Sequence, residues 1–441
     1  MDSITETRTK PPDCRDSVVI PVDGTEILII EKKRKGWRGL QYVAQVIQVA
    51  DYKRLVHAMK FGLALVLVSL LYMLEAVHDK LGDNAMWAVM TVVVVFEYTA
   101  GATVTKGLNR LVGTILGGGL GSLVAIIAQE IGGVGKAVII GISIFIFGAA
   151  ATYLRTIANI KKKYDYGVLI FILTLSLVSI SGVRVDEIIQ VASARLSSIC
   201  MGFGICAHVS LFIFPVWAGD ELHSSLASKF NSIAHSIEDC MNGKKMMGEA
   251  RKPSNCLSVL SSKSMDESLA NFAKWEPWHG RFGFYYPWSK YLQIAGQLRE
   301  LAACITSAEG HLKAKQEISI NPLLLSIKEQ CEATSLLLVN TMTQLRDCII
   351  YMKQFPRQEL VLEELQARRV QLSSHIQVSS LALTINQSAG SENGMKGSGV
   401  RIVIQVFLLV EILDKVELLV KEVKELGISA GFVNQTLDDK C

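Results

Sequence analysis

The sequence predicts an all-α membrane protein, in which six transmembrane helices are followed by a cytoplasmic helical bundle. Two observations carry this prediction. Residues 61–217 are strongly apolar and divide into runs close to the length that crosses a bilayer, which is about 20 residues for a helix. The residues from 218 onward contain no further run of this kind, but their apolar side chains recur at helical spacing.

The six apolar runs are expected at 61–77, 85–101, 111–128, 137–154, 167–181 and 188–217. The lysine and arginine content of the loops predicts their orientation. The basic loops fall on one side of the membrane: the lead-in 31–60 with eight basic residues, loop 102–110 with two and loop 155–166 with four. The alternate loops contain one basic residue each, so both termini are predicted to be cytoplasmic.

Three segments follow from this pattern. They are a cytoplasmic N-terminal segment with an amphipathic lead-in at 1–57, a six-span transmembrane domain at 58–217 and a cytoplasmic helical domain at 218–441. In the last segment, helical patterns are expected around 220–242, 290–316, 321–353, 357–385 and 400–426. The final pattern repeats apolar residues from Ile402 to Val423 in 3–4 alternation, with charges on its other faces from Glu411 onward. This helix is predicted to pack in a bundle or at a subunit contact rather than to span the membrane.

Composition and motifs exclude several classes of function. The net charge of +4 is too small to indicate a nucleic-acid partner. The nine cysteines are scattered without a Cys-x-x-Cys pair, so we expect free thiols. The sequence contains no zinc-protease motif, nucleophile elbow or phosphate-binding loop. We therefore expect neither an enzyme nor a bound cofactor or metal.

The third apolar run contains glycines four residues apart, at Gly113, Gly117 and Gly121. In lipid, this spacing allows two helix backbones to approach closely. The run is therefore predicted to be a helix-packing face, and a direct role in a pore is the alternative.

Basic residues near the ends of the spans are the candidates for an anion path: Arg195, Arg184, Arg110, Lys106 and Arg155. Arg195 lies at the head of an otherwise apolar segment, where an arginine faces protein, water or an anion rather than lipid. Rings of basic side chains are how pores favour anions. We therefore expect residues 58–217 to form an anion pore. For the residues on the cytoplasmic side, the alternative is the ordinary positive-inside signal.

Lys60 and Glu97 form a second candidate pair. The first span leaves the cytoplasm near Lys60 and the second returns to it just past Glu97. In an antiparallel hairpin, both side chains lie toward the cytoplasmic side, so a salt bridge between the spans is expected. The alternative is that Lys60 extends to lipid headgroups while Glu97 faces water.

A third candidate is the aromatic segment 275–291, which begins Trp275-Glu276-Pro277 and contains eight aromatic residues, counted to Tyr291. It is predicted to pack as a hydrophobic plug between the soluble bundle and the cytoplasmic ends of the spans. Glu276 is its only acid. Because a carboxylate in a packed patch is costly unless it is paired, Glu276 is expected to anchor the segment to a cation.

Several segments carry a family resemblance. The first group is Trp87–Glu97, Gly101–Thr103 and Lys106–Arg110, and the second is Tyr164–Gly167, Pro215–Gly219 and Trp275–Pro277. Together they resemble the signature of the plant aluminium-activated malate transporter family of anion channels, over roughly residues 51–290.

The resemblance implies a passive channel for malate and for inorganic anions such as chloride and nitrate. It also implies that activity depends on basic residues near the positions above, on a salt bridge between the first two spans and on the Trp275-Glu276-Pro277 segment. A homodimer in the plasma membrane, rather than the vacuolar membrane, is expected. A secondary organic-anion transporter and a membrane-anchored helical scaffold stay open as alternatives, as do the preferred anion and activation by aluminium.

Overall fold

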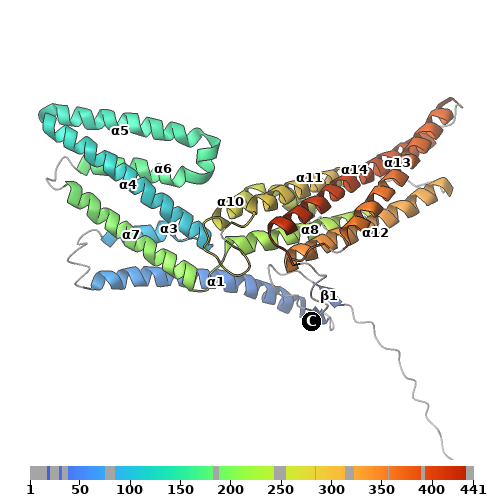
Figure 1. The fold of residues 1–441 in the computed structure, drawn as a ribbon, viewed down its shortest axis with the longest axis horizontal. Coiled ribbons are helices and arrows are strands. Elements are labelled where there is room, and N and C mark those ends of the chain that lie inside the picture. The colour runs from blue at the N-terminus through green and yellow to red at the C-terminus, as the bar shows by residue number, and fades with distance from the viewer. Residues whose placement is uncertain are drawn as a thin grey trace, which may run out of the picture.

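The computed structural model describes residues 17–19, 29–31, 38–74, 85–181, 188–242, 255–283, 285–312, 322–355, 357–388 and 393–433. Its helices form two lobes joined end to end (Figure 1), an apolar lobe built by α1 to α7 and a helical bundle built by α8 to α14. Before them, β1 (Ser17–Val19) and β2 (Ile29–Glu31) pair as a short antiparallel ribbon that the sequence pattern did not indicate.

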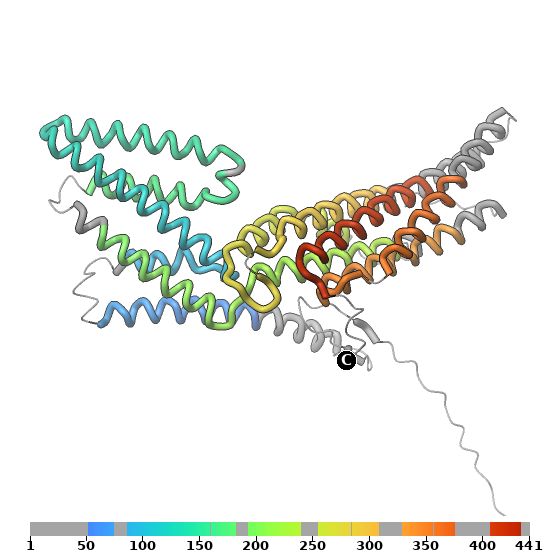
Figure 2. Tube along the Cα trace, in the orientation of Figure 1, coloured from blue at the N-terminus to red at the C-terminus, as the bar shows by residue number. Residues whose placement is uncertain are grey.

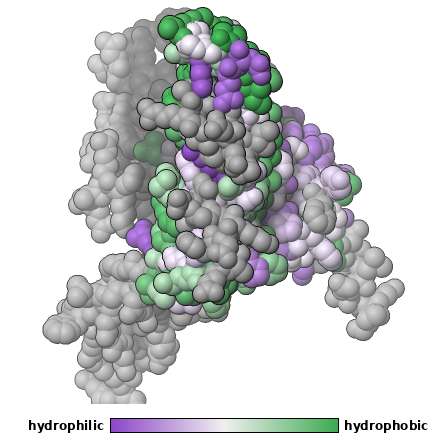
Figure 3. Space-filling model, turned by 90° about the vertical axis from the view of Figure 1, so that its left-hand side faces the viewer, coloured by the Kyte–Doolittle hydropathy of each residue, from purple (hydrophilic) through white to green (hydrophobic). Residues whose placement is uncertain are grey.

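The apolar lobe contains six helices among the described residues: α1 (Arg38–Met73), α3 (Ala85–Val95), α4 (Ala100–Ile131), α5 (Gly133–Thr156), α6 (Ala158–Ser181) and α7 (Ile188–Phe212). They correspond to the six predicted runs. Parts of all of them except α3 are long and apolar enough to cross a membrane. Seen end-on from this lobe, hydrophobic side chains line much of the described surface, as lipid-facing helices require (Figure 3).

The predicted loop 102–110 is wrong, because these residues form the first part of α4. Lys106 and Arg110 therefore lie on a helix that begins at the N-cap residue Thr99. With 32 residues, α4 is about 48 Å long, whereas the hydrocarbon core is about 30 Å thick. The helix can therefore continue beyond the membrane with charged residues on it. Hydropathy alone predicts a loop at these residues.

The predicted amphipathic lead-in is helical and continues into the first span as one uninterrupted helix, α1. Another predicted boundary differs from the structure. Most of the predicted loop 155–166 is helical, since α5 ends at Thr156 and α6 begins at Ala158. The basic residues there suggested a loop, although lysine and arginine are good helix formers.

The second predicted span is interrupted after the 11 residues of α3, at residues 96–99. Irregular backbone at membrane depth requires burial in protein and satisfied polar groups. Phe96 and Thr99 are buried, and the amide of Glu97 donates to the hydroxyl of Thr103 at 3.0 Å. The amide of Ala100 donates to the carbonyl of Val216 at 2.9 Å, which ties this break to the one between α7 and α8.

The glycine spacing on α4 forms the helix-packing face that the sequence predicts. A Cβ atom at Gly113 would lie 2.4 Å from the carbonyl oxygen of Gly167, and one at Gly117 would lie 2.6 Å from that of Phe171. At Gly121 the nearest atom is the carbonyl oxygen of Leu175, at 3.0 Å. These glycines let α4 and α6 pack backbone to backbone.

The bundle consists of α8 (Ala218–Asn242), α9 (Asn255–Ser261), α10 (Lys263–Ala273), α11 (Trp288–Leu312), α12 (Pro322–Tyr351), α13 (Gln358–Ser388) and α14 (Asn393–Ser429). Helix α8 follows α7 directly and carries the chain out of the apolar lobe into the bundle (Figure 2). The stripe predicted on the final helix is buried from Val406 to Val423. Helices α9 and α10, which the pattern did not indicate, lie at the start of the bundle.

Candidate functional site

Arg195 is a cation inside a membrane-spanning segment. It lies near the start of the apolar stretch Ser193–Phe212 of α7 and is partly buried. Its guanidinium carbon lies 5.0 Å from the ring centroid of Trp87 on α3, and its Nε atom is buried without a hydrogen-bond partner. Among the described residues, no carboxylate forms an ion pair with Arg195. Its positive charge is therefore not neutralised by the part of the protein that the structure describes.

Arg110 is a buried candidate cation, with 4% of its surface exposed. Its Nη1 atom donates to the hydroxyl of Tyr166 on α6 at 3.1 Å, and its Nε atom has no partner. A phenol hydroxyl carries no charge at neutral pH. Within the part of the chain that the structure describes, the charge of Arg110, like that of Arg195, is therefore not neutralised by a carboxylate.

Lys106 and Arg155, by contrast, are paired with carboxylates. Lys106 forms an ion pair with Glu97, and its Nζ atom also lies 5.9 Å from the ring centroid of Tyr166. Arg155 donates through Nε and Nη2 to the two carboxylate oxygens of Asp165, at 2.7 and 3.2 Å. Their charges are thus compensated locally. Arg184, the remaining candidate, lies outside the described residues.

The predicted ion pair between Lys60 and Glu97 does not form. Lys60 is buried, with 3% of its surface exposed, and donates to the carbonyl of Phe214 at 3.2 Å. Because α3 stops at Val95, Glu97 lies in the turn that leads into α4 and meets Lys106 on that helix. The alternative for Lys60 is also wrong, since its amine is held inside the protein rather than among lipid headgroups.

Lys60 instead binds a carbonyl just past the end of α7. The helix stops at Phe212, and Phe214 has a φ of 45°, in the left-handed region that a side chain rarely adopts. The carbonyls at a helix end lack partners within the helix, and a lysine is a suitable donor for them. The Lys60 ammonium therefore stabilises the point at which the chain leaves the apolar lobe.

Glu276 connects the two lobes through backbone amides. Its Oε1 atom accepts from Gly101 at 3.2 Å and from Ala218 at 2.6 Å, while Oε2 accepts from Gly219 at 3.0 Å. Gly101 is in the first turn of α4, and Ala218 and Gly219 begin α8. One carboxylate thus binds the N-termini of two helices, where free amides and the helix dipoles favour negative charge. We call Glu276 and these three amides the helix junction.

The predicted partner of Glu276 was a cation, but no lysine or arginine among the described residues pairs with it; its partners are backbone amides. The nearest basic group among its described contacts is His279, whose Nε2 atom lies 3.9 Å from Oε2. Burial raises the pKa of the Glu276 carboxyl, while the amide bonds and His279 act in the opposite direction. The sequence signalled the need for a partner but could not identify backbone amides as that partner.

Two glycines make the helix junction possible. A Cβ atom at Gly101 would lie 2.4 Å from the carbonyl oxygen of Phe272, and one at Gly219 would lie 2.8 Å from the ring of Trp288. A side chain at either position would push its helix away from the Glu276 carboxylate. In the sequence, both glycines belong to the motifs that carry the family resemblance, but nothing there indicates that they allow this close packing.

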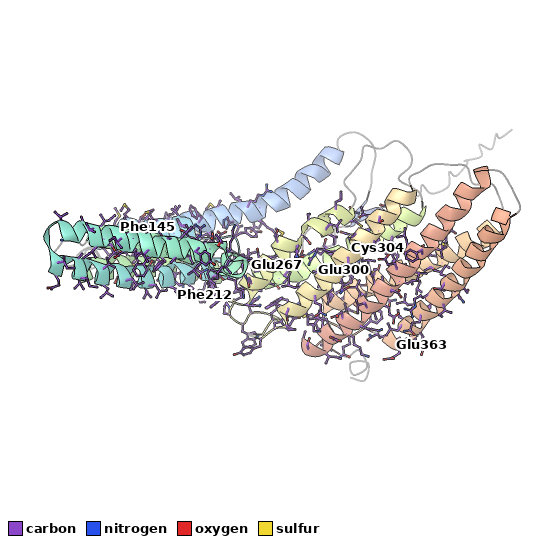
Figure 4. All side chains as sticks on the ribbon, turned by 90° about the horizontal axis from the view of Figure 1, so that it is seen from above. Phe145, Phe212, Glu267, Glu300, Cys304 and Glu363 are labelled. Carbon is purple, nitrogen blue, oxygen red and sulfur yellow. The ribbon has the colours of Figure 1, made fainter. Side chains whose placement is uncertain are left out.

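The aromatic segment is only partly a hydrophobic plug. Phe282, Trp288 and Tyr291 are buried in the bundle core. Trp275 and Trp278, on either side of the buried Glu276, are 50% and 70% exposed, and Pro277 is exposed as well. A second polar contact joins the lobes nearby, where Lys162 on α6 donates to Glu267 on α10 at 2.7 Å. In Figure 4, Glu267 lies where the lobes meet.

The sequence analysis did not single out Trp87 and Tyr166, the aromatic residues that contact Arg195 and Arg110. Both stand within the motifs that carry the family resemblance, but an aromatic residue in a span is more often part of the packing. The signal available for Trp87 was its place near the start of α3, as Arg195 lies near the start of the apolar stretch of α7.

Known sequences similar to this chain identify its family. A sequence model of the family described as "Aluminium activated malate transporter" matches residues 46–402. Aluminum-activated malate transporter 14 of Arabidopsis thaliana is 43% identical over 291 residues, which are 64% of this chain and 53% of that protein. Aluminum-activated malate transporter 2 of the same plant is 44% identical over 281 residues, or 62% of this chain and 56% of that protein.

A relative from Triticum aestivum, Aluminum-activated malate transporter 1, is 39% identical over 301 residues, which are 65% of this chain and 66% of that protein. The chain spans about half the length of the Arabidopsis relatives that it matches. The region that matches the family model extends from within α1 into α14 and contains every candidate residue that the structure describes. The chain therefore belongs to the aluminium-activated malate transporter family.

Proposed function

We propose that the protein is an anion channel, which passes malate and inorganic anions such as chloride and nitrate passively through a pore lined by basic side chains. The observation that carries the proposal is that Arg195, within a span, forms no ion pair with a carboxylate among the described residues. Two other cations of the lobe, Lys106 and Arg155, have carboxylate partners, whereas Arg195 contacts the face of Trp87. A cation without an acid partner is available to a passing anion.

The chemistry of guanidinium suits malate in particular. A guanidinium group donates two parallel hydrogen bonds to a carboxylate, and its positive charge also attracts chloride and nitrate. In the predicted topology, Arg195 lies toward the outer side and Arg110 toward the cytoplasmic side. The two arginines would thus lie at successive depths along one path. The relatives' names point to malate as one substrate of the family.

Flux measured with purified protein in liposomes tests the proposal. We expect malate, chloride and nitrate to cross passively, with a current that reverses at the Nernst potential of the permeant anion. A secondary organic-anion transporter would instead show malate flux that depends on a second, coupled solute. A membrane-anchored scaffold would give no flux, and this result would refute the proposal. Parallel measurements with and without aluminium test whether the activation named in the relatives applies to this chain.

The finer parts of the proposal concern assembly, location and topology. We propose a homodimer in the plasma membrane with both termini in the cytoplasm. Light scattering of the purified protein in detergent reports its mass, and imaging of a fluorescent fusion separates the plasma membrane from the vacuolar membrane. A tag after residue 441 that antibodies reach from outside intact cells would contradict the cytoplasmic C-terminus.

A further inference from the structure

We propose that Trp87 is the positioning residue that holds Arg195 ready for a carboxylate without neutralising its charge. This inference rests on the proposed function, because it assigns to Trp87 the discrimination between malate and chloride at that site. The cations of the apolar lobe differ in the partners that hold them. Lys106 and Arg155 are held by carboxylates, whereas the ring of Trp87 lies 5.0 Å from the guanidinium carbon of Arg195.

A carboxylate partner and an aromatic partner have opposite consequences for an anion. A carboxylate occupies the N–H groups of the guanidinium and cancels its charge. An aromatic ring attracts the cation electrostatically through its face and accepts no conventional hydrogen bond from the edge of the guanidinium plane. The contact with Trp87 therefore does not occupy the N–H groups of Arg195, and its Nε atom has no hydrogen-bond partner among the described residues. Those groups are the ones that bind a carboxylate in bidentate geometry.

The packing of α3 against α7 fixes the position of Trp87. A Cβ atom at Gly202 of α7 would lie 2.7 Å from the carbonyl oxygen of Ala88, so the two helices are in close contact next to Trp87. Ala88 and Thr91 are fully buried in this contact, and the Thr91 hydroxyl donates to the carbonyl of Trp87 at 2.6 Å. Arg195 and Gly202 are seven residues apart, which places them on the same face of α7.

This arrangement restricts a long side chain that otherwise has many rotamers. An arginine loses much side-chain entropy when an anion orders it, so a side chain that is ordered beforehand binds more tightly. A chloride ion is attracted by the positive charge of the guanidinium group whatever the orientation of that group. A carboxylate requires the plane of the guanidinium to face it correctly, so loss of Trp87 should reduce malate binding more than chloride binding.

The test compares malate-to-chloride permeability ratios of variants in liposomes or oocyte membranes. Arg195→Gln and Trp87→Leu should each lower the ratio, and for Trp87→Leu we expect about three- to tenfold, the range for loss of one cation–π contact. The double variant should resemble either single variant, because both remove the same oriented cation. Trp278→Leu, which removes an exposed tryptophan outside the spans, should keep the wild-type ratio.

Trp87 also fills space, so a second experiment separates electrostatics from packing. Tryptophan with increasing numbers of ring fluorines, introduced at position 87, keeps the shape of the ring while it weakens the attraction of the ring face for a cation. The permeability ratio should fall stepwise with fluorination while the total current stays similar. A ratio that does not change across this series would overturn the role of Trp87, even if Trp87→Leu fails to assemble.

The outcomes distinguish this inference from the proposed function. If Arg195→Gln lowers the ratio but the Trp87 variants do not, the channel proposal stands and the role of Trp87 is wrong. If Arg195→Gln conducts with the wild-type ratio and amplitude, Arg195 does not line the path, and both statements fail at this site.

Discussion

Glu276 accepts a hydrogen bond from the backbone amide of Gly101, although the two residues are 175 positions apart in the sequence. The same carboxylate binds the amides that begin α8, at Ala218 and Gly219. The start of α4 and the start of the bundle are thus held by one side chain. A movement of the bundle is therefore expected to reach α4, the helix that carries Lys106 and Arg110.

The helix junction predicts a graded response at position 276. Glu276→Ala leaves three buried amides without this acceptor, and hydrogen bonds to charged groups contribute about 1.5–3 kcal/mol each. Glu276→Gln keeps one acceptor oxygen, so its effect should be intermediate. Both variants should lower the melting temperature in detergent and change open probability without shifting the reversal potential, because the proposed pore lies in the spans.

A matched control for Glu276 is Glu300→Gln, which removes the charge of an exposed glutamate paired with Lys415. Exposed ion pairs contribute at most about 1 kcal/mol, so this variant should behave like the wild type. Wild-type melting and gating in Glu276→Ala, at equal expression, would show that the helix junction does not couple the lobes.

The ion pair between Glu97 and Lys106 predicts which two substitutions have non-additive effects on stability. Glu97→Gln and Lys106→Met remove the same pair, so their effects on stability should fail to add by about 0.5–1 kcal/mol. Lys60 has a different partner, the carbonyl of Phe214. Glu97→Gln and Lys60→Met should therefore add within about 0.5 kcal/mol. Thermal melts of the wild type, the single variants and the two double variants provide both double-mutant cycles. The opposite pattern would show that Glu97 pairs with Lys60 and not with Lys106.

Glycines on α4 predict a position-dependent cost for one methyl group. In Gly117→Ala the new Cβ atom would lie 2.6 Å from the carbonyl oxygen of Phe171, and overpacking of this kind costs about 1–3 kcal/mol. A Cβ atom at Gly119, two residues further on, would meet no other atom within 4 Å, so Gly119→Ala should be neutral or stabilising. Melting temperatures in detergent should separate the two variants. Equal effects would mean that α4 and α6 are not packed at Gly117.

The sequence predicted those features that depend on periodicity and hydropathy. Six apolar runs, the glycine face of α4 and the buried stripe of α14 are read directly from the spacing of side chains. Helix boundaries at basic residues were wrong, because hydropathy locates the edge of the membrane while hydrogen bonding decides where a helix ends. Lys106 lies past the predicted edge of the apolar run but still within α4.

Partners of the charged residues were harder to predict, for a physical reason. The sequence indicates that Glu276 needs a partner, because it is the only acid in a segment rich in aromatic residues. The partner itself depends on tertiary structure, since backbone amides at helix starts bind a carboxylate as a cation does and leave no mark in the sequence. Lys60 illustrates the same limit, because its partner is a carbonyl 154 residues away.

His223 in the bundle predicts how stability depends on pH. It is 7% exposed, and its Nδ1 atom lies 2.8 Å from the hydroxyl of the fully buried Tyr291. Burial lowers the pKa of His223 to about 4, from an ordinary value of 6.5. Between these two values the unfolded chain binds a proton that the folded chain does not. The contribution of His223 to stability is therefore complete above pH 6.5 and is lost progressively as the pH falls toward 4.

The size of this effect follows from linkage. From pH 7 to pH 5, a histidine with these two pKa values lowers the free energy of unfolding by about 2 kcal/mol. His223→Gln keeps a polar group next to Tyr291 but cannot titrate, so its melting temperature should fall less over the same interval. His235→Gln, an exposed histidine on the same helix, is the matched control and should keep the pH dependence of the wild type. If wild type and His223→Gln lose stability equally between pH 7 and pH 5, the acid sensitivity of the protein arises elsewhere, and His223 is not held neutral by the bundle.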